Sequence, residues 1–162
     1  MTNSKGQQFI EILHQENTYI NQLMNTLIEE KESLSKRDFT HMQELAVKKD
    51  NLSNLLEESS KTRLTILNAQ ANTAKDALNS LINSLNQEEA TLVKQLNQEL
   101  TNKITACREL NAINGQVITS NLNTRREIVD VLTGKDTKTA INTYSSSGNL
   151  RTHSESINHQ EA

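Results

Sequence analysis

The segment ATLVKQLNQELTNKITACRELNAINGQVITSNLNTRREIVDVL, residues 90–132, decides the fold of this chain. Apolar residues recur along it with the period of an α-helix, which predicts one long helix with an apolar side. The residues that carry this period are Val93, Leu96, Leu100, Ile104, Cys107, Leu110, Val117, Ile118, Leu122, Ile128, Val129 and Leu132. No proline interrupts the segment, and Gly134 supplies a helix stop shortly after it.

A second helical stripe covers residues 7–35, near the start of the chain. Its apolar seam advances in steps of three and four residues and is interrupted only by Glu16 and Glu30. The seam residues are Phe9, Leu13, Ile20, Leu23, Leu27 and Leu34. This stripe predicts a long first helix that buries one side.

A third stripe begins after the helical period is lost at residues 35–38 and continues to about residue 68. Asp38 can accept a hydrogen bond from free amides of the next turn, so we expect it to be the N-cap of the second helix. Lys49, Ser59 and Arg63 interrupt this seam. Because so short a connection can only reverse the chain, the first two helices should form an antiparallel hairpin.

The connection to the last helix is less regular. The small, polar residues 69–73 predict a turn, in which Asn72 or Thr73 could cap a third helical element. That element is defined by aliphatic residues between Leu78 and Leu85. Residues 86–89, NQEE, are compatible either with a break or with an exposed turn of one continuing helix.

The composition supports an all-α fold. The chain has no Pro and no Trp, and 34% of its residues are hydrophobic but only 2% are aromatic, so burial must come from aliphatic stripes on long helices. We therefore expect an elongated antiparallel helical bundle of three to four helices, with long first, second and last helices. Residues 1–134 form the bundle domain, and residues 135–162 are predicted to be a flexible tail because they are rich in Ser, Thr and Asn without an apolar period.

Charge and hydropathy exclude several classes of function. The net charge is −3, which argues against binding to a nucleic-acid backbone. No apolar run approaches the roughly 20 residues that span a bilayer, and the first residues lack the apolar core of a signal peptide. We therefore expect a cytoplasmic protein without stable membrane insertion. The single cysteine, Cys107, lies in a helical pattern and is expected to be a small buried thiol.

A catalytic or metal site is not expected. The pair Glu11-x-x-His14 has the spacing of a di-iron bundle ligand set, but the chain offers no second pair to face it. The favoured interpretation is that Glu11 and His14 are solvated polar residues on a helix. No glycine-rich phosphate loop and no paired-cysteine motif occur either. The sequence thus predicts a protein that is not an enzyme and needs no metal or cofactor.

The step Asn111-x-x-Asn114-Gly115 in the last helix places two amides on one face, and Asn121 extends that face. These amides could hydrogen-bond to facing helices and set their register, as a polar core residue does in a coiled coil. Alternatively, Gly115 lets another backbone approach and the amides bind its polar groups. The two interpretations can hold at different positions.

The order of these features resembles the FlgN-type flagellar export chaperones. The resemblance runs over nearly the whole chain. It rests on the opening apolar helix, the turn ending in Asp38, Lys48-Lys49 leading to Leu52, Leu55 and Leu56, then Arg63, Asn111-x-x-Asn114-Gly115, Val131-Leu132-Thr133-Gly134, and a tail with Tyr144 and Gly148. In that family the tail tyrosine is commonly followed directly by glycine, whereas three serines separate Tyr144 from Gly148 here.

The resemblance implies a cytoplasmic chaperone that binds hook-associated proteins through its last helix and tail and docks on the export gate. The last helix also carries more apolar circumference than one packed seam requires, and such a surplus favours a partner. The expected client-binding residues are Asn111, Asn114, Gly115, Ile118, Leu122, Ile128, Val129 and Leu132. Tyr144, the only Phe, Tyr or Trp after Phe39, is the expected export-gate contact. The alternative is a structural coiled-coil or adaptor protein that uses the same stripes for self-association, for example as a homodimer.

Overall fold

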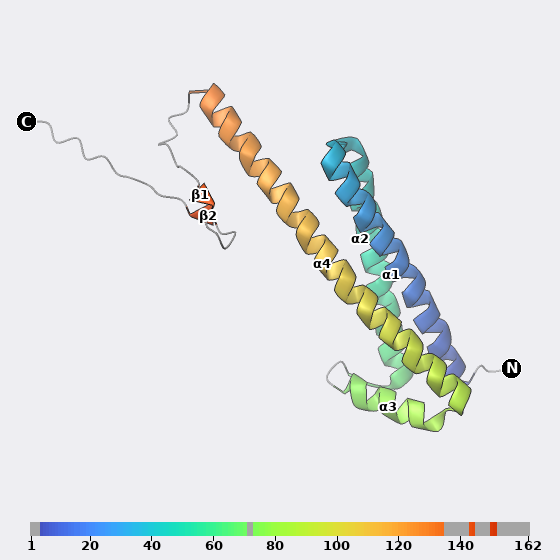
Figure 1. Ribbon diagram of the computed structural model, residues 1–162. Coiled ribbons are helices and arrows are strands. Elements are labelled where there is room, and N and C mark those ends of the chain that lie inside the picture. Colours follow the sequence, from blue (N-terminus) through green and yellow to red (C-terminus); the bar gives the residue numbers. More distant parts are fainter. Residues whose placement is uncertain (1–3, 71–72, 135–142, 145–149, 152–162) are drawn as a thin grey trace, which may run out of the picture. The chain divides into compact units, whose positions relative to one another are not determined.

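A computed structural model of the chain describes residues 4–70, 73–134, 143–144 and 150–151 (Figure 1). Within this part, four helices and two short strands follow one another. Their bounds are α1 Lys5–Lys36, α2 Phe39–Leu67, α3 Ala74–Ser84, α4 Gln87–Leu132, β1 Thr143–Tyr144 and β2 Leu150–Arg151. The expected helical bundle with long first, second and last helices is confirmed.

Local caps define the hairpin of α1 and α2. Ser4 and Gln7 form a capping box at the start of α1, in which each side chain accepts a hydrogen bond from the other residue's backbone N–H. Arg37 ends α1 in the left-handed region, with φ at 56°. Asp38 then caps α2 as predicted, because its Oδ1 accepts a hydrogen bond from the backbone N–H of His41 at 3.1 Å.

The connection between α3 and α4 is a break, which settles the question that the sequence left open. Leu85 is extended, with φ −86° and ψ 158°, and the Oδ1 of Asn86 accepts a hydrogen bond from the backbone N–H of Glu89 at 2.9 Å. Thr73 occupies the N-cap position of α3, but its hydroxyl bonds to Gln70 and makes no cap hydrogen bond. The other expected cap, Asn72, lies outside the described residues.

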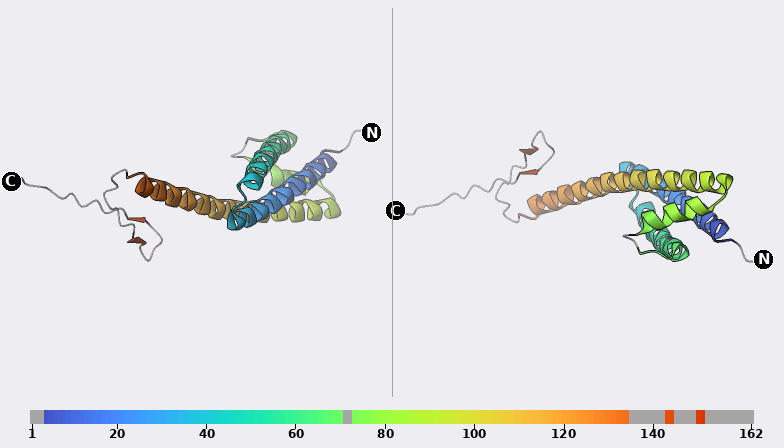
Figure 2. Two further views of the ribbon diagram at one scale, coloured as in Figure 1. Left: turned by 90° about the horizontal axis from the view of Figure 1, so that it is seen from above. Right: turned by 90° about the horizontal axis from the view of Figure 1, so that it is seen from below.

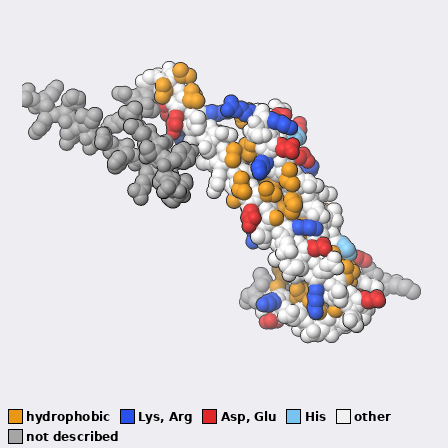
Figure 3. All heavy atoms as spheres, in the orientation of Figure 1, with side chains coloured by type: hydrophobic (Ala, Val, Ile, Leu, Met, Phe, Trp, Pro, Cys, Tyr) orange, Lys and Arg blue, Asp and Glu red, His pale blue; other side chains and the backbone are white. Residues whose placement is uncertain are grey.

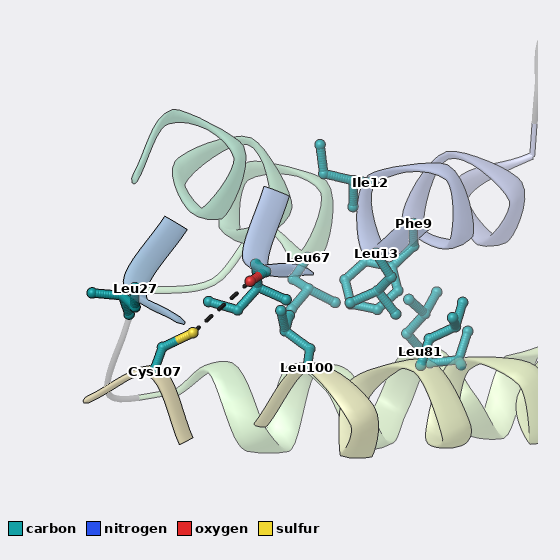
Figure 4. Close-up of a cluster of buried hydrophobic side chains, with 11 residues drawn as sticks. Phe9, Ile12, Leu13, Leu27, Leu67, Leu81, Leu100 and Cys107 are labelled. Atoms are coloured by element: carbon teal, nitrogen blue, oxygen red, sulfur yellow. Dashed lines mark hydrogen bonds between the residues drawn. The ribbon is translucent and has the colours of Figure 1, made fainter. Parts of the chain in front are cut away.

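The core lies where α1 packs on α4, with α3 across one end. Phe9, Leu13 and Val93 are fully buried there, and Leu67 and Leu81 extend the cluster into α2 and α3 (Figure 4). A Cβ atom on Gly6 would overlap the side chain of Leu85, so the lack of a side chain at Gly6 allows the start of α1 to approach the end of α3. Figure 2 shows α3 crossing this end of the long helices.

Polar contacts define the direction of each helix. Contacts between Glu16 and Arg63 and between Glu30 and Lys49 require α2 to run antiparallel to α1. Hydrogen bonds from Asn17 to Leu96 and from Asn114 to Leu27 require α4 to run parallel to α1. The arrangement is therefore up, down and up for α1, α2 and α4.

The chain divides into two compact units, Met1–Ile118 and Thr119–Ala162. Gly134 has a φ of 62° just after α4 ends, which confirms it as the helix stop. Strands β1 and β2 pair antiparallel, with Thr143 opposite Arg151 and Tyr144 opposite Leu150. The rest of the expected tail lies outside the described residues, so its flexibility stays a prediction.

Candidate functional site

Two ion pairs join buried acids of α1 to half-buried bases of α2, and they are formed by the residues that interrupt the two apolar seams. Glu16 is 2% exposed, and its Oε2 lies 2.9 Å from Nε of Arg63, although neither atom has an aligned hydrogen bond. Glu30 is also buried and accepts a hydrogen bond from Nζ of Lys49 at 2.8 Å. These pairs were not predicted from the sequence. The signal was present, because the two acids and the two bases are both spaced two heptads apart.

The second ion pair extends into α4 through the asparagine step. Nδ2 of Asn114 donates to Oε2 of Glu30 and to the carbonyl of Leu27, each at 2.8 Å. Nζ of Lys49 donates to Oδ1 of Asn111 at 3.2 Å. Asn111, Lys49, Glu30 and Asn114 therefore form one network across the three long helices. Asn114 is 1% exposed, which agrees with the interpretation that its amide bonds to facing helices and sets their register. Its side chain is not open to a client in this structure.

Burial raises the pKa of two groups in this region. The pKa of the Glu16 carboxyl is raised by desolvation, and the charge of Arg63 offsets part of that increase. The pKa of the Cys107 thiol is raised by burial, and its Sγ lies 3.8 Å from the carbonyl oxygen of Ile20, a contact drawn in Figure 4. A protonated, buried thiol is a poor nucleophile, and Cys107 has the packing role expected from its pattern.

The last part of α4 carries an exposed apolar surface. Leu122 is 60% and Leu132 is 80% exposed, while Ile128 and Val129 are each more than half exposed. Ile118 is half-buried, and the position that a Cβ atom of Gly115 would occupy has no atom within 4 Å. Figure 3 shows hydrophobic side chains at the end of α4 and a separate group over the middle of the bundle.

Helical spacing groups the expected client-binding residues. Asn111, Ile118, Leu122 and Val129 follow one another at intervals of four or seven residues, so they share one face of α4. Ile128 and Leu132 lie on the adjoining side. Three further aliphatic residues of this helix are exposed but were not among the predicted client-binding residues: Ile113, Val117 and Val131. Their exposure could not be inferred from periodicity, because the apolar residues of α4 occupy more than one side.

The other predicted sites have separate outcomes. Tyr144 lies in β1, and its side chain is outside the described structure. Among the described residues, no group of three or more His, Cys, Asp and Glu side chains is placed to hold a metal ion. None of the helices in the described part combines the length and apolar character needed to cross a membrane.

Comparison with known proteins identifies the family. The family model described as FlgN protein matches residues 1–152, which is nearly the whole chain of 162 residues. No curated protein and no solved structure matches the chain significantly. The matched range includes all four helices, the asparagine step and Tyr144. The chain therefore belongs to the FlgN family, a family of flagellar chaperones.

Proposed function

We propose that this protein is a cytoplasmic flagellar type III export chaperone that binds hook-associated proteins through the exposed face of α4. It holds these proteins before secretion, prevents their premature assembly and delivers them to the export gate. One observation supports the binding surface above all. Every apolar side chain of α4 from Leu122 to Leu132 is at least half exposed, on a helix whose earlier part is packed.

An apolar face of this kind favours an amphipathic helix as its ligand. Burying one exposed Leu, Ile or Val side chain contributes about 1.5–3 kcal/mol, so a few anchors are enough for specific binding. Ile118, Leu122 and Val129 are spaced to meet the apolar stripe of such a helix. Gly115 allows close backbone approach at one end of the face, and Asn111 supplies an amide there. Asn114 is assigned to the bundle and not to the client.

The decisive test is the double substitution Leu122→Asp and Val129→Asp, assayed for binding to a purified hook-associated protein. Binding should be lost while the circular dichroism signal of the helices is retained, because these side chains are not part of the core. The matched control is Ser120→Asp with Asn123→Asp, which adds the same charge to exposed positions of the same segment. Normal binding by the first variant would refute the proposed surface.

Self-association through the same face makes a different prediction. A structural coiled-coil protein would form a stable oligomer whose mass does not change when a hook-associated protein is added. The chaperone function predicts a one-to-one complex. Sedimentation of the free protein and of the mixture distinguishes the two.

We further propose that Tyr144 contacts the export gate. The proposal rests on the family resemblance of the tail and on the position of Tyr144 as the only Phe, Tyr or Trp after Phe39. An aromatic ring with a polar hydroxyl suits a shallow pocket on a partner protein.

A further inference from the structure

A groove lies within the first unit, between α2 and α4 and above α1. Its volume is about 430 Å³. Ile20, Leu23 and Leu27 of α1 form its floor, Leu56 lines it from α2, and Ile104 lines it from α4. Leu23, Leu56 and Ile104 are only partly buried, so the chain itself leaves this apolar surface incompletely covered.

The groove has the position of a missing bundle helix. α2 and α4 both contact α1, whereas α3 has only 11 residues and lies across the end of the bundle. In a four-helix bundle, a fourth long helix fills the space between two helices that pack on a common neighbour. A groove of this volume takes a few aliphatic side chains, as the anchors of a bound helix require.

The groove adjoins the proposed client surface. Asn111 lines the groove, and the face that it begins continues through Gly115 and Ile118 at helical spacing. A helix lying against this face could therefore place its next side chains in the groove. The tail of the chain is a poor occupant, because residues 135–162 show no helical apolar period.

Charges at the rim favour an acidic residue on the occupant. Lys49 and Arg63 line the groove but already pair with Glu30 and Glu16. Glu57 lines it as well and pairs with Lys61. Arg108 also lines it, is exposed, and forms no ion pair within the described residues. A carboxylate on a bound helix would complement Arg108.

We propose that this groove receives the aliphatic side chains of an amphipathic helix of the exported client, with an acidic residue of that helix beside Arg108. The inference rests on the proposed chaperone function and adds a second binding surface to it. The exposed face of α4 alone would hold a helix on one side. The groove would surround the anchors of the same helix with three helices and would select for their size.

The test fills the groove from α2 with Ser60→Trp. Ser60 lines the groove, whereas Asn54, on the same helix, does not, so Asn54→Trp is the matched control. The chain has two tyrosines but no tryptophan, so fluorescence excited beyond the absorption of tyrosine reports each new side chain alone. The Ser60→Trp variant should emit at a shorter wavelength than the Asn54→Trp variant, which verifies that the new indole fills the groove. Affinity for a purified full-length hook-associated protein should fall about tenfold or more for Ser60→Trp and should be normal for Asn54→Trp.

The outcomes separate this inference from the proposed function. Normal binding by Ser60→Trp, with its blue-shifted emission, would overturn the groove even if Leu122→Asp with Val129→Asp abolished binding. Normal client binding by Ser60→Trp and also by Leu122→Asp with Val129→Asp would overturn both the groove and the exposed face of α4 as client-binding surfaces. If Ser60→Trp lost helicity, Ser53→Trp would carry the same test, because Ser53 also lines the groove.

Two further measurements test the nature of the occupant. Arg108→Glu should weaken client binding, whereas Arg108→Lys, which keeps the positive charge, should bind the client normally. Equal client affinity of the two variants would refute the acidic contact. Sedimentation of the free protein tests for a second copy. If Ser60→Trp converted a dimer into a monomer without changing client affinity, the groove would hold another copy of this chain and the proposal would be wrong.

Discussion

Nδ2 of Asn114 lies 2.8 Å from Oε2 of Glu30, so an amide of α4 binds a buried carboxylate of α1. The other oxygen of that carboxylate accepts a hydrogen bond from Lys49 of α2. Glu30 is thus the centre of a polar layer to which all three long helices contribute. Such a layer disfavours a slip of one helix along another, because a slip would leave a buried charge without its partners.

Substitution of Asn114 by alanine should destabilise the free protein. The change removes two hydrogen bonds and leaves part of the Glu30 carboxylate without a donor, so the free energy of unfolding should fall by about 1–3 kcal/mol. Urea unfolding followed by circular dichroism measures this loss. Asn121→Ala is the matched control, since Asn121 lies one heptad further along α4 and is exposed, and its effect should stay within about 0.5 kcal/mol. Equal effects of the two changes would show that the polar layer does not stabilise the bundle.

Removal of Arg63 should be costly because it leaves Glu16 buried without its counter-charge. Arg63→Met should lower the free energy of unfolding at neutral pH by about 3 kcal/mol. The double variant Arg63→Met with Glu16→Gln should recover part of this loss, since no charge is then buried. Both variants can be compared by urea unfolding at pH 7.

The same pair predicts a dependence on pH. Burial raises the pKa of Glu16 above its ordinary value of 4.5 in the folded state, and loss of Arg63 should raise this pKa further. A raised folded pKa favours folding below 4.5, and this contribution is lost as pH rises through the folded value. The stability gap between Arg63→Met and its double variant with Glu16→Gln should therefore widen from pH 4.5 towards pH 7. A gap that does not change with pH would contradict a raised pKa for Glu16.

Asp38 should stabilise the start of α2 through its cap. Asp38→Ala removes the acceptor for the backbone N–H of His41 and should cost about 0.5–2 kcal/mol, measured by thermal or urea unfolding. Asp50→Ala offers a control inside the same helix, where Asp50 is exposed and alanine has the higher helix propensity. Stability should be unchanged or slightly higher in that variant. An undiminished stability of Asp38→Ala would mean that tertiary packing alone sets the turn.

Tyr144→Ala should separate delivery from binding. If Tyr144 contacts the export gate, secretion of hook-associated proteins should fall while their affinity for the purified chaperone stays normal. Tyr144→Phe shows whether the ring or the hydroxyl matters. Loss of client affinity would instead place Tyr144 at the client surface, and unchanged secretion would leave it without a role in docking.

Local signals were sufficient for most of the helix boundaries. Asp38 and Gly134 could be placed from sequence because an N-cap and a left-handed stop depend on the residues within one turn. The break at Leu85 could not, since the polar residues around it suit an exposed helix equally well. Close packing of Leu85 beside Gly6, which is distant in sequence, accompanies the break.

The sequence by itself determined the helical stripes, the hairpin and the surplus of apolar residues on α4, because periodicity and capping act over a few residues. Only the tertiary structure decided that Asn114 is buried against Glu30 while Asn111 lies at the rim of a groove. Both are asparagines on nearly the same face, and their different roles arise from the positions of α1 and α2. Those positions depend on packing between segments that are far apart along the chain, which no local pattern records.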